Sequence, residues 1–110
     1  MIARIWKGAV RNADADEYAD YIAGTGLAEY RQTPGNQGAW MLTRAVGDHT
    51  EVMTFSLWDS VDAVKAFAGD DYETAVYYPE DDRYLVERDD VCAHYDVRYG
   101  RRMSSAAERE

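Results

Sequence analysis

Residues 51–69 constrain the fold more than any other stretch of this chain. The stretch begins as a run of β-branched and aromatic residues, which favours a strand. Ser60 follows, and its hydroxyl can accept a hydrogen bond from a free amide at a helix start. Apolar residues then recur at helical spacing until Gly69, a residue type that commonly follows the last helical turn. We therefore predict a strand over residues 51–58 that leads directly into a helix over residues 61–68.

The first third of the chain predicts a strand and two helical pieces. Residues 1–10 alternate two sets of side chains, as a strand does, and neither set is cleanly polar. Residues 12–16 offer capping and acidic side chains for a helix, and apolar residues at helical spacing follow. Glycines weaken the last turns of this helix, so residues 27–32 are expected to form a second piece. Residues 33–36 are a strong turn signal.

The strand over residues 51–58 is expected to be the second arm of a β-hairpin. Residues 38–46 have the same β-rich composition, and residues 47–50 between the two runs have turn-forming character. This predicts two antiparallel neighbours in the sheet.

The last third of the chain is expected to complete the sheet. Two aspartates at residues 70–71 can cap a short helix over residues 72–78, which Pro79 would end. Residues 80–90 have the composition of an acidic, solvated loop, and residues 91–99 predict the last strand.

This order of elements defines the expected fold class. It is α+β with the ferredoxin-like order βαββαβ, in which a four-stranded antiparallel sheet carries both helices on one face. Trp6 beside Ile5 and Trp40 beside Met41 make the strands apolar on both sides, so the second face should also be buried. A homodimer packed sheet against sheet satisfies this requirement. Residues 1–99 would form the domain and residues 100–110 a flexible polar tail.

Charge and cysteine content exclude several functional classes. Acidic residues outnumber basic ones 21 to 12, and the net charge is -9, which argues against a nucleic-acid partner. No apolar run approaches the roughly 20 residues of a membrane span. A single cysteine, Cys92, and an N-terminus without a secretion signal lead us to expect a cytoplasmic protein.

Several short motifs resemble a known family. Residues 57–60 followed by an Ala/Phe-rich helix and Gly69, residues 33–35 before the second strand, and residues 93–95 in the last strand resemble the antibiotic biosynthesis monooxygenase domain. The resemblance covers roughly residues 1–99. It implies a dimeric α/β barrel, in which the strands of two subunits form the barrel and each subunit has one pocket between sheet and helices.

The same resemblance bears on cofactors. Similar proteins include cofactor-independent oxygenases of aromatic polyketides and haem-degrading monooxygenases, which use an Asn, a Trp and an axial His. Trp58 matches the Trp, whereas the Asn position falls at Trp6 and the His position at Val76 or Tyr77. The resemblance therefore favours an enzyme without a prosthetic group, and haem is the less favoured ligand.

Aromatic residues with polar tips supply the candidate substrate-binding side chains. The chain has nine Tyr and three Trp but only two Phe, a composition suited to pocket walls and interfaces. Trp58, the last strand residue before the turn into the helix, should place its indole near the mouth of the space between the layers. The alternative is a structural role in the core, at the dimer interface or in a lid. The predicted substrate-binding residues are Trp6, Trp58, Phe67, Tyr77 and Tyr78.

His94 is the candidate catalytic base. It shares one face of the last predicted strand with Cys92 and Asp96, and an imidazole oriented by a carboxylate is a suitable base near neutral pH. A histidine hydrogen-bonded to a neighbour for structural reasons is the alternative. Two histidines and one cysteine without ligand spacing predict no metal site. Gly-rich phosphate-binding motifs are absent from the sequence, so no nucleotide or flavin cofactor is expected.

Three functional readings follow. The leading one is a cofactor-independent monooxygenase of an aromatic or otherwise electron-rich small molecule, whose carbanion or phenolate passes an electron to oxygen. The alternative is a non-catalytic protein that holds a hydrophobic ligand, haem included, in the same pocket. A purely structural dimerisation module is the third reading.

Overall fold

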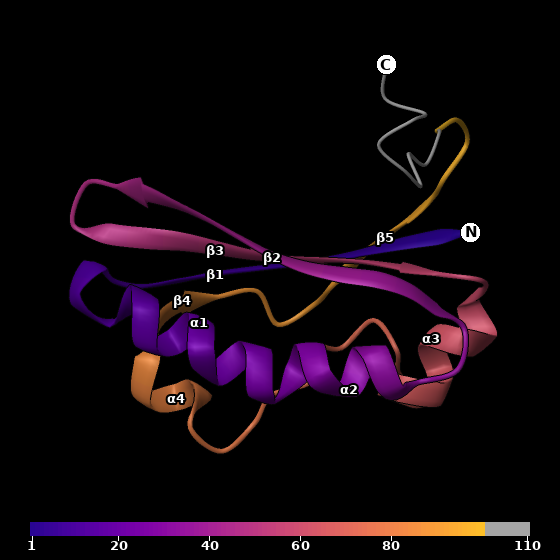
Figure 1. Cartoon of the computed structure of the whole chain (residues 1–110), viewed down its shortest axis with the longest axis horizontal. Coiled ribbons are helices and arrows are strands. Elements are labelled where there is room, and N and C mark those ends of the chain that lie inside the picture. The colour runs from indigo at the N-terminus through magenta and orange to yellow at the C-terminus, as the bar shows by residue number, and fades with distance from the viewer. Residues whose placement is uncertain (101–110) are drawn as a thin grey trace, which may run out of the picture.

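The computed structural model describes residues 1–100. An antiparallel sheet carries all the α-helices on one face (Figure 1). In chain order the elements are β1 (Ile2–Arg11), η1 (Asn12–Asp14), α1 (Ala15–Gly24), α2 (Gly26–Gln32), β2 (Asn36–Val46), β3 (His49–Trp58), α3 (Val61–Ala68), α4 (Asp81–Tyr84), β4 (Leu85–Arg88) and β5 (Ala93–Asp96). The expected α+β class and ferredoxin-like arrangement are confirmed, with five strands in place of four.

The β2–β3 hairpin and β1 form the regular part of the sheet. β3 pairs with β1 along its whole length, from Ile2 opposite Trp58 to Arg11 opposite His49. Every second residue of β3, beginning at Thr50, is buried, as expected for a strand with one face on the core. The predicted hairpin is confirmed with a shorter loop, because Val46 already pairs with His49. Gly47 has φ +61°, a conformation that glycine adopts without strain.

The fourth position of the sheet is filled by two short strands. β4 pairs with one end of β1, opposite Gly8 to Val10, and β5 pairs with the other end, opposite Ile2 to Ile5. Between them the chain leaves the sheet. The amide of Cys92 donates to the carbonyl of Glu73, and the amide of Ala75 donates to the carbonyl of Asp90. The predicted strand over residues 91–99 is therefore wrong in extent, since only Ala93–Asp96 belongs to β5.

The predicted helix over residues 72–78 is absent from the part of the chain that the structure describes. Asp71 caps a single turn, in which its carbonyl and its carboxylate both accept from Thr74. Residues 73–75 then pair in extended form with residues 90–92, and this pairing uses the backbone groups that a helix would need. The segment up to residue 80 crosses below the sheet without regular structure.

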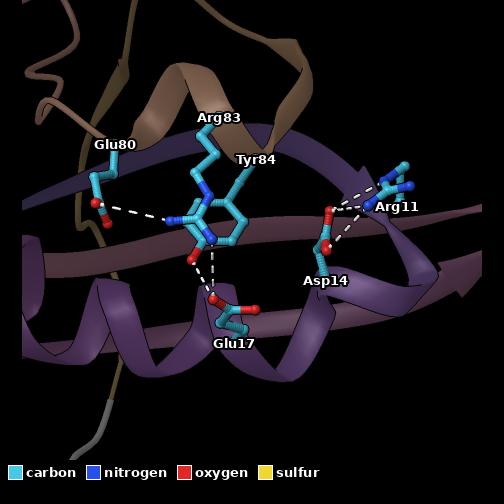
Figure 2. Close-up of polar contacts among 6 residues, drawn as sticks. All are labelled: Arg11, Asp14, Glu17, Glu80, Arg83 and Tyr84. Atoms are coloured by element: carbon cyan, nitrogen blue, oxygen red, sulfur yellow. Dashed lines mark hydrogen bonds and ion pairs between the residues drawn. The ribbon is translucent and has the colours of Figure 1, made fainter.

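The expected acidic loop over residues 80–90 contains both α4 and β4. Figure 2 shows how side chains of α4 reach α1: the Tyr84 hydroxyl donates to Glu17 at 2.8 Å, and Arg83 lies 3.6 Å from the same carboxylate. Arg83 also lies 3.8 Å from Glu80. These contacts hold α4 against α1 and bury Asp81, so the prediction of a fully solvated loop is wrong.

The helical predictions in the first two thirds of the chain are confirmed. α3 has the predicted bounds, and the Ser60 hydroxyl accepts from the amide of Ala63 at 3.2 Å. The first helical region is split into α1 and α2 at Thr25, between two glycines. The expected polar tail comprises residues 100–110, and all of it except Gly100 lies outside the described residues.

The sheet face opposite the helices is apolar, and no other element of residues 1–100 covers it. Trp40 and Leu42 on β2 are each about half exposed, at 49% and 50%. They lie opposite Phe55 and Met53 of β3, and the rings of Trp40 and Phe55 are 5.8 Å apart. Within residues 1–100, no helix is both long and apolar enough to cross a membrane.

Candidate functional site

A cavity of about 40 Å³ lies between the sheet and the helices. β1 and β3 supply Arg4, Trp6 and Thr54, and the helices supply Tyr18, Ile22, Gly26, Leu27, Tyr30, Phe67 and Asp81. Residues 75–78 and Cys92 complete the lining. Six of the lining side chains are aromatic, and four of those are tyrosines. The cavity thus has apolar walls with hydroxyl groups distributed over them.

Four of the five predicted substrate-binding residues line this cavity, namely Trp6, Phe67, Tyr77 and Tyr78. Trp58 does not line it. Its indole is fully buried in a separate apolar cluster with Ile2, Tyr30 and Val64, and its Nε1 donates to the Ser56 hydroxyl at 2.9 Å. Trp58 lies on the same face of β3 as the core residues, so the turn into α3 covers its indole instead of opening beside it.

Trp6 and Tyr77 are tied to the point where the chain leaves the sheet. The Trp6 Nε1 donates to the carbonyl of Asp89 at 3.0 Å and lies 3.1 Å from the Tyr77 hydroxyl. The Tyr77 hydroxyl donates to the same carbonyl. Gly8 leaves space for the indole, because a Cβ there would lie 2.7 Å from the Trp6 ring. The gap between β4 and β5 therefore supplies the acceptor that fixes two cavity walls.

A buried carboxylate lies at the α4 end of the cavity. Asp81 is 2% exposed, and it accepts from the Tyr18 hydroxyl at 3.0 Å and from the backbone amide of Tyr78 at 2.7 Å. Burial, and then the nearby Asp81 charge, raise the pKa of Tyr18. Burial also raises the pKa of Tyr78, whose hydroxyl donates to Glu29 at 2.5 Å. These tyrosines remain neutral hydrogen-bond donors near pH 7.

A buried arginine, Arg4, also lines the cavity. It is 1% exposed and lies on the cavity face of β1, two residues before Trp6. Its Nη1 donates to the carbonyl of Tyr72 at 2.6 Å and lies 2.9 Å from the Nε2 of His94. Arg4 is not among the site residues predicted from the sequence, although a charged residue between Ile2 and Trp6 on an otherwise apolar strand face is a visible signal.

His94 contacts Arg4 and is not a lining residue of the cavity. A guanidinium group has only donors, so the His94 Nε2 must accept from Arg4 and the imidazole must be neutral. Burial, and then the Arg4 charge, lower the pKa of His94. Because its basic lone pair is engaged, this geometry argues against His94 as a base that acts directly on a molecule in the cavity.

The titration of His94 gives a testable pH dependence. The ordinary pKa of histidine is about 6.5, and the folded-state pKa is lower, so the unfolded chain binds more protons as the pH falls through 6.5. We expect the stability contribution of His94 to be complete above pH 6.5 and to decline below it. The free energy of unfolding of the wild type and of His94→Gln, measured in urea from pH 8 to 5.5, should therefore converge toward low pH. Glu73, whose charge raises the His94 pKa, opposes the effect. A difference that stays constant or widens would contradict this assignment.

The other reactive groups of the cavity do not form a metal or haem site. Residues 1–100 contain no group of three or more His, Cys, Asp or Glu placed to hold a metal ion. Burial raises the pKa of the Cys92 thiol, which therefore stays protonated at neutral pH. No histidine lies among the cavity residues, and a volume of about 40 Å³ is far too small for a porphyrin, so the described cavity does not fit haem. Its chemistry rests on one cation, one carboxylate and neutral hydroxyl donors.

Comparison with solved structures places this arrangement in a known class of fold. A candidate antibiotic biosynthesis monooxygenase from Bacillus cereus matches with a TM-score of 0.64 and 17% sequence identity, over 93% of this chain and 97% of that chain. An uncharacterized NIPSNAP domain protein from Burkholderia xenovorans matches with a TM-score of 0.57 and 15% identity, over 89% of this chain and 95% of that chain. The chain is thus a ferredoxin-like α+β protein, as the resemblance to antibiotic biosynthesis monooxygenases implies. No protein-family model and no curated protein sequence matches it.

Proposed function

We propose that this chain is a cytoplasmic homodimer that oxidises an aromatic or otherwise electron-rich small molecule as a cofactor-independent monooxygenase. The observation that carries the proposal is the cavity between sheet and helices, whose walls include six aromatic side chains. Flat apolar walls with a few hydroxyl donors are the usual surroundings of a bound aromatic molecule. The structural likeness to a candidate monooxygenase supports the same class of reaction.

Substrate entry requires the cavity to open. An empty cavity of about 150 Å³ admits benzene, whereas the volume here is about 40 Å³. Residues 75–78 and Cys92 form the part of the wall outside helices and strands, and residues 75–78 carry Tyr77 and Tyr78. We therefore propose that displacement of these two rings admits the substrate and that their return excludes water.

The proposed reaction balances without an external reductant. A methylene carbon activated by an aromatic ring loses a proton to the Asp81 carboxylate, the one carboxylate among the cavity residues, and the carbanion passes an electron to oxygen. Recombination gives a peroxide on that carbon, which gains a proton. The second C–H bond and the O–O bond then break, so the carbon becomes a carbonyl and the remaining oxygen leaves as water. The protein contributes orientation, hydroxyl donors to the developing charge and exclusion of water.

An oxygen-uptake screen with anthrones and hydroquinones tests this function. We expect the wild type to consume about one oxygen molecule per anthrone, with one atom from ¹⁸O₂ in the product. Ala75→Leu, which fills the cavity, should reduce the rate to that of spontaneous oxidation. Ala66→Leu, on the exposed side of α3, is the matched control and should retain full activity. Uptake that is equal with and without protein would rule out oxidation of these substrates.

The alternative is a binding protein without turnover, and haem is one of its possible ligands. A titration with hemin, followed in the Soret band beside a free-hemin control, separates the two classes. A Soret shift that saturates at one equivalent per chain would favour the haem-binding alternative. The cavity as described leads us to expect no saturable shift.

A further inference from the structure

We propose that Arg4 is an anion-binding group, and that the natural ligand of the cavity is a small molecule whose flat apolar body carries a carboxylate or phenolate. This inference rests on the proposed function, because it assigns the substrate class of the same cavity. The two proposals can be tested separately, because binding of an anion does not depend on turnover of a substrate.

Arg4 is a buried charge without an acidic partner in the described residues. Its side chain is 1% exposed, yet no carboxylate in residues 1–100 lies within ion-pairing distance of it. A buried charge is strongly disfavoured unless it is paired, and buried arginines are normally matched by an acid. Its recorded hydrogen-bond partners, the Tyr72 carbonyl, the His94 ring and the Tyr30 hydroxyl, are all neutral. The guanidinium is therefore held in place without being neutralised.

Arg4 also has a hydrogen-bond donor that is not satisfied. The Nε of Arg4 is buried and has no hydrogen-bond partner, and it is the one such side-chain atom recorded within residues 1–100. A guanidinium presents Nε and a terminal nitrogen in the geometry that matches a carboxylate. Because Arg4 lines the cavity, a ligand there can supply the missing acceptor.

Asp81, the carboxylate that shares the cavity, belongs to another element and is already hydrogen-bonded. Asp81 already accepts two hydrogen bonds and belongs to α4. Arg4 instead contacts the Tyr72 carbonyl, and its guanidinium lies 5.9 Å from the ring centre of Phe67 on α3. α3 and α4 lie at opposite ends of the helical layer (Figure 1). The anionic end of a ligand is therefore expected at the α3 side, with its ring between Trp6 and Phe67.

The contacts of His94 give it a positioning role. Its Nε2 accepts from Arg4 Nη1, and its ring lies edge-on to Tyr72, with 5.0 Å between the ring centres. These contacts fix the plane of the guanidinium and do not engage its Nε.

The test compares benzoate with benzamide, which has the same shape without the charge. Binding to the intact protein is measured by NMR chemical-shift titration in the absence of any oxidisable substrate. We expect benzoate to bind the wild type at least tenfold more tightly than benzamide. Arg4→Gln should abolish this preference. Arg11→Gln should retain it, because Arg11 lies at the far end of the same strand, is exposed and pairs with Asp14.

A second variant covers the case in which Arg4→Gln does not fold. Thr54→Asp places a carboxylate on the strand beside Arg4, at another lining position. It should fold and should lose the preference for benzoate, because the internal acid takes the place of the ligand. Equal binding of benzoate and benzamide to the wild type, or a preference that persists in either variant, would overturn the proposal. Oxygen uptake plays no part in this readout, so the anion site and the monooxygenase function can fail separately.

Discussion

Trp58→Ala is expected to lower the free energy of unfolding by about 3–5 kcal/mol. The Trp58 indole is fully buried and packs against Tyr30 and Phe67, with ring centres 5.5 Å and 6.1 Å away. Truncation would leave a cavity in this cluster and remove the donor to Ser56. Since small domains are stable by only about 5–15 kcal/mol in total, urea denaturation should show a large fall in the midpoint.

Trp40→Ala is the matched control for this prediction. Trp40 is 49% exposed on the open face of the sheet, so its truncation removes less buried contact. Both variants should be measured at a protein concentration low enough for the chain to be monomeric, because the proposed homodimer would bury Trp40 and add to the stability. Equal losses for the two tryptophans would contradict the assignment of Trp58 to the core.

Leu42→Glu is expected to convert the proposed homodimer into a monomer. Leu42 lies near the middle of β2 on the apolar face, opposite Met53 and two residues from Trp40. If this face packs against a second copy, symmetry places both new carboxylates in the interface, where an unpaired buried charge costs about 3–5 kcal/mol. Sedimentation should then give a mass of 12.5 kDa in place of twice that value.

Thr43→Glu is the control for the charge itself. Thr43 is exposed and follows Leu42 in the same strand, so its side chain points to the other face of the sheet. It should leave the dimer intact. A wild-type protein that sediments at 12.5 kDa in the micromolar range would overturn the predicted homodimer.

The regular part of the fold is predictable because its signals are local. α3 follows from a capping serine, apolar residues at helical spacing and a terminal glycine, and the structure reproduces its bounds. The hairpin follows from two β-rich runs around a glycine-containing turn. Residues 72–78 have comparable helical signals, but they pair in part with residues 90–92, which lie far along the chain. Propensity alone does not reveal such a non-local pairing.

The sequence predicts most of the aromatic lining of the candidate site, but neither of its two buried charged residues, Arg4 and Asp81. Trp6, Tyr77 and Tyr78 are aromatic residues with polar tips, which favour pocket walls, and they line the cavity together with Phe67. Trp58, which is predicted for the same reason, does not line it. The acidic run that contains Asp81 resembles a solvated surface, and only the contacts of α4 with α1 reveal its burial. The significance of Arg4 depends on the absence of a carboxylate near it among residues 1–100, and no pattern in the sequence records this.

Because of the gap between β4 and β5, the cavity wall can change without a change in the sheet. β4 and β5 pair with β1 on either side of the gap, and these pairings set their register. Residues 89–92 lie inside the gap, and their backbone groups form hydrogen bonds with Trp6, Tyr77 and residues 73–75. Insertions or exchanges in these four residues would reshape the cavity without shifting any strand. An engineer who seeks a new ligand for this scaffold could therefore randomise this short segment and leave the rest of the chain unchanged.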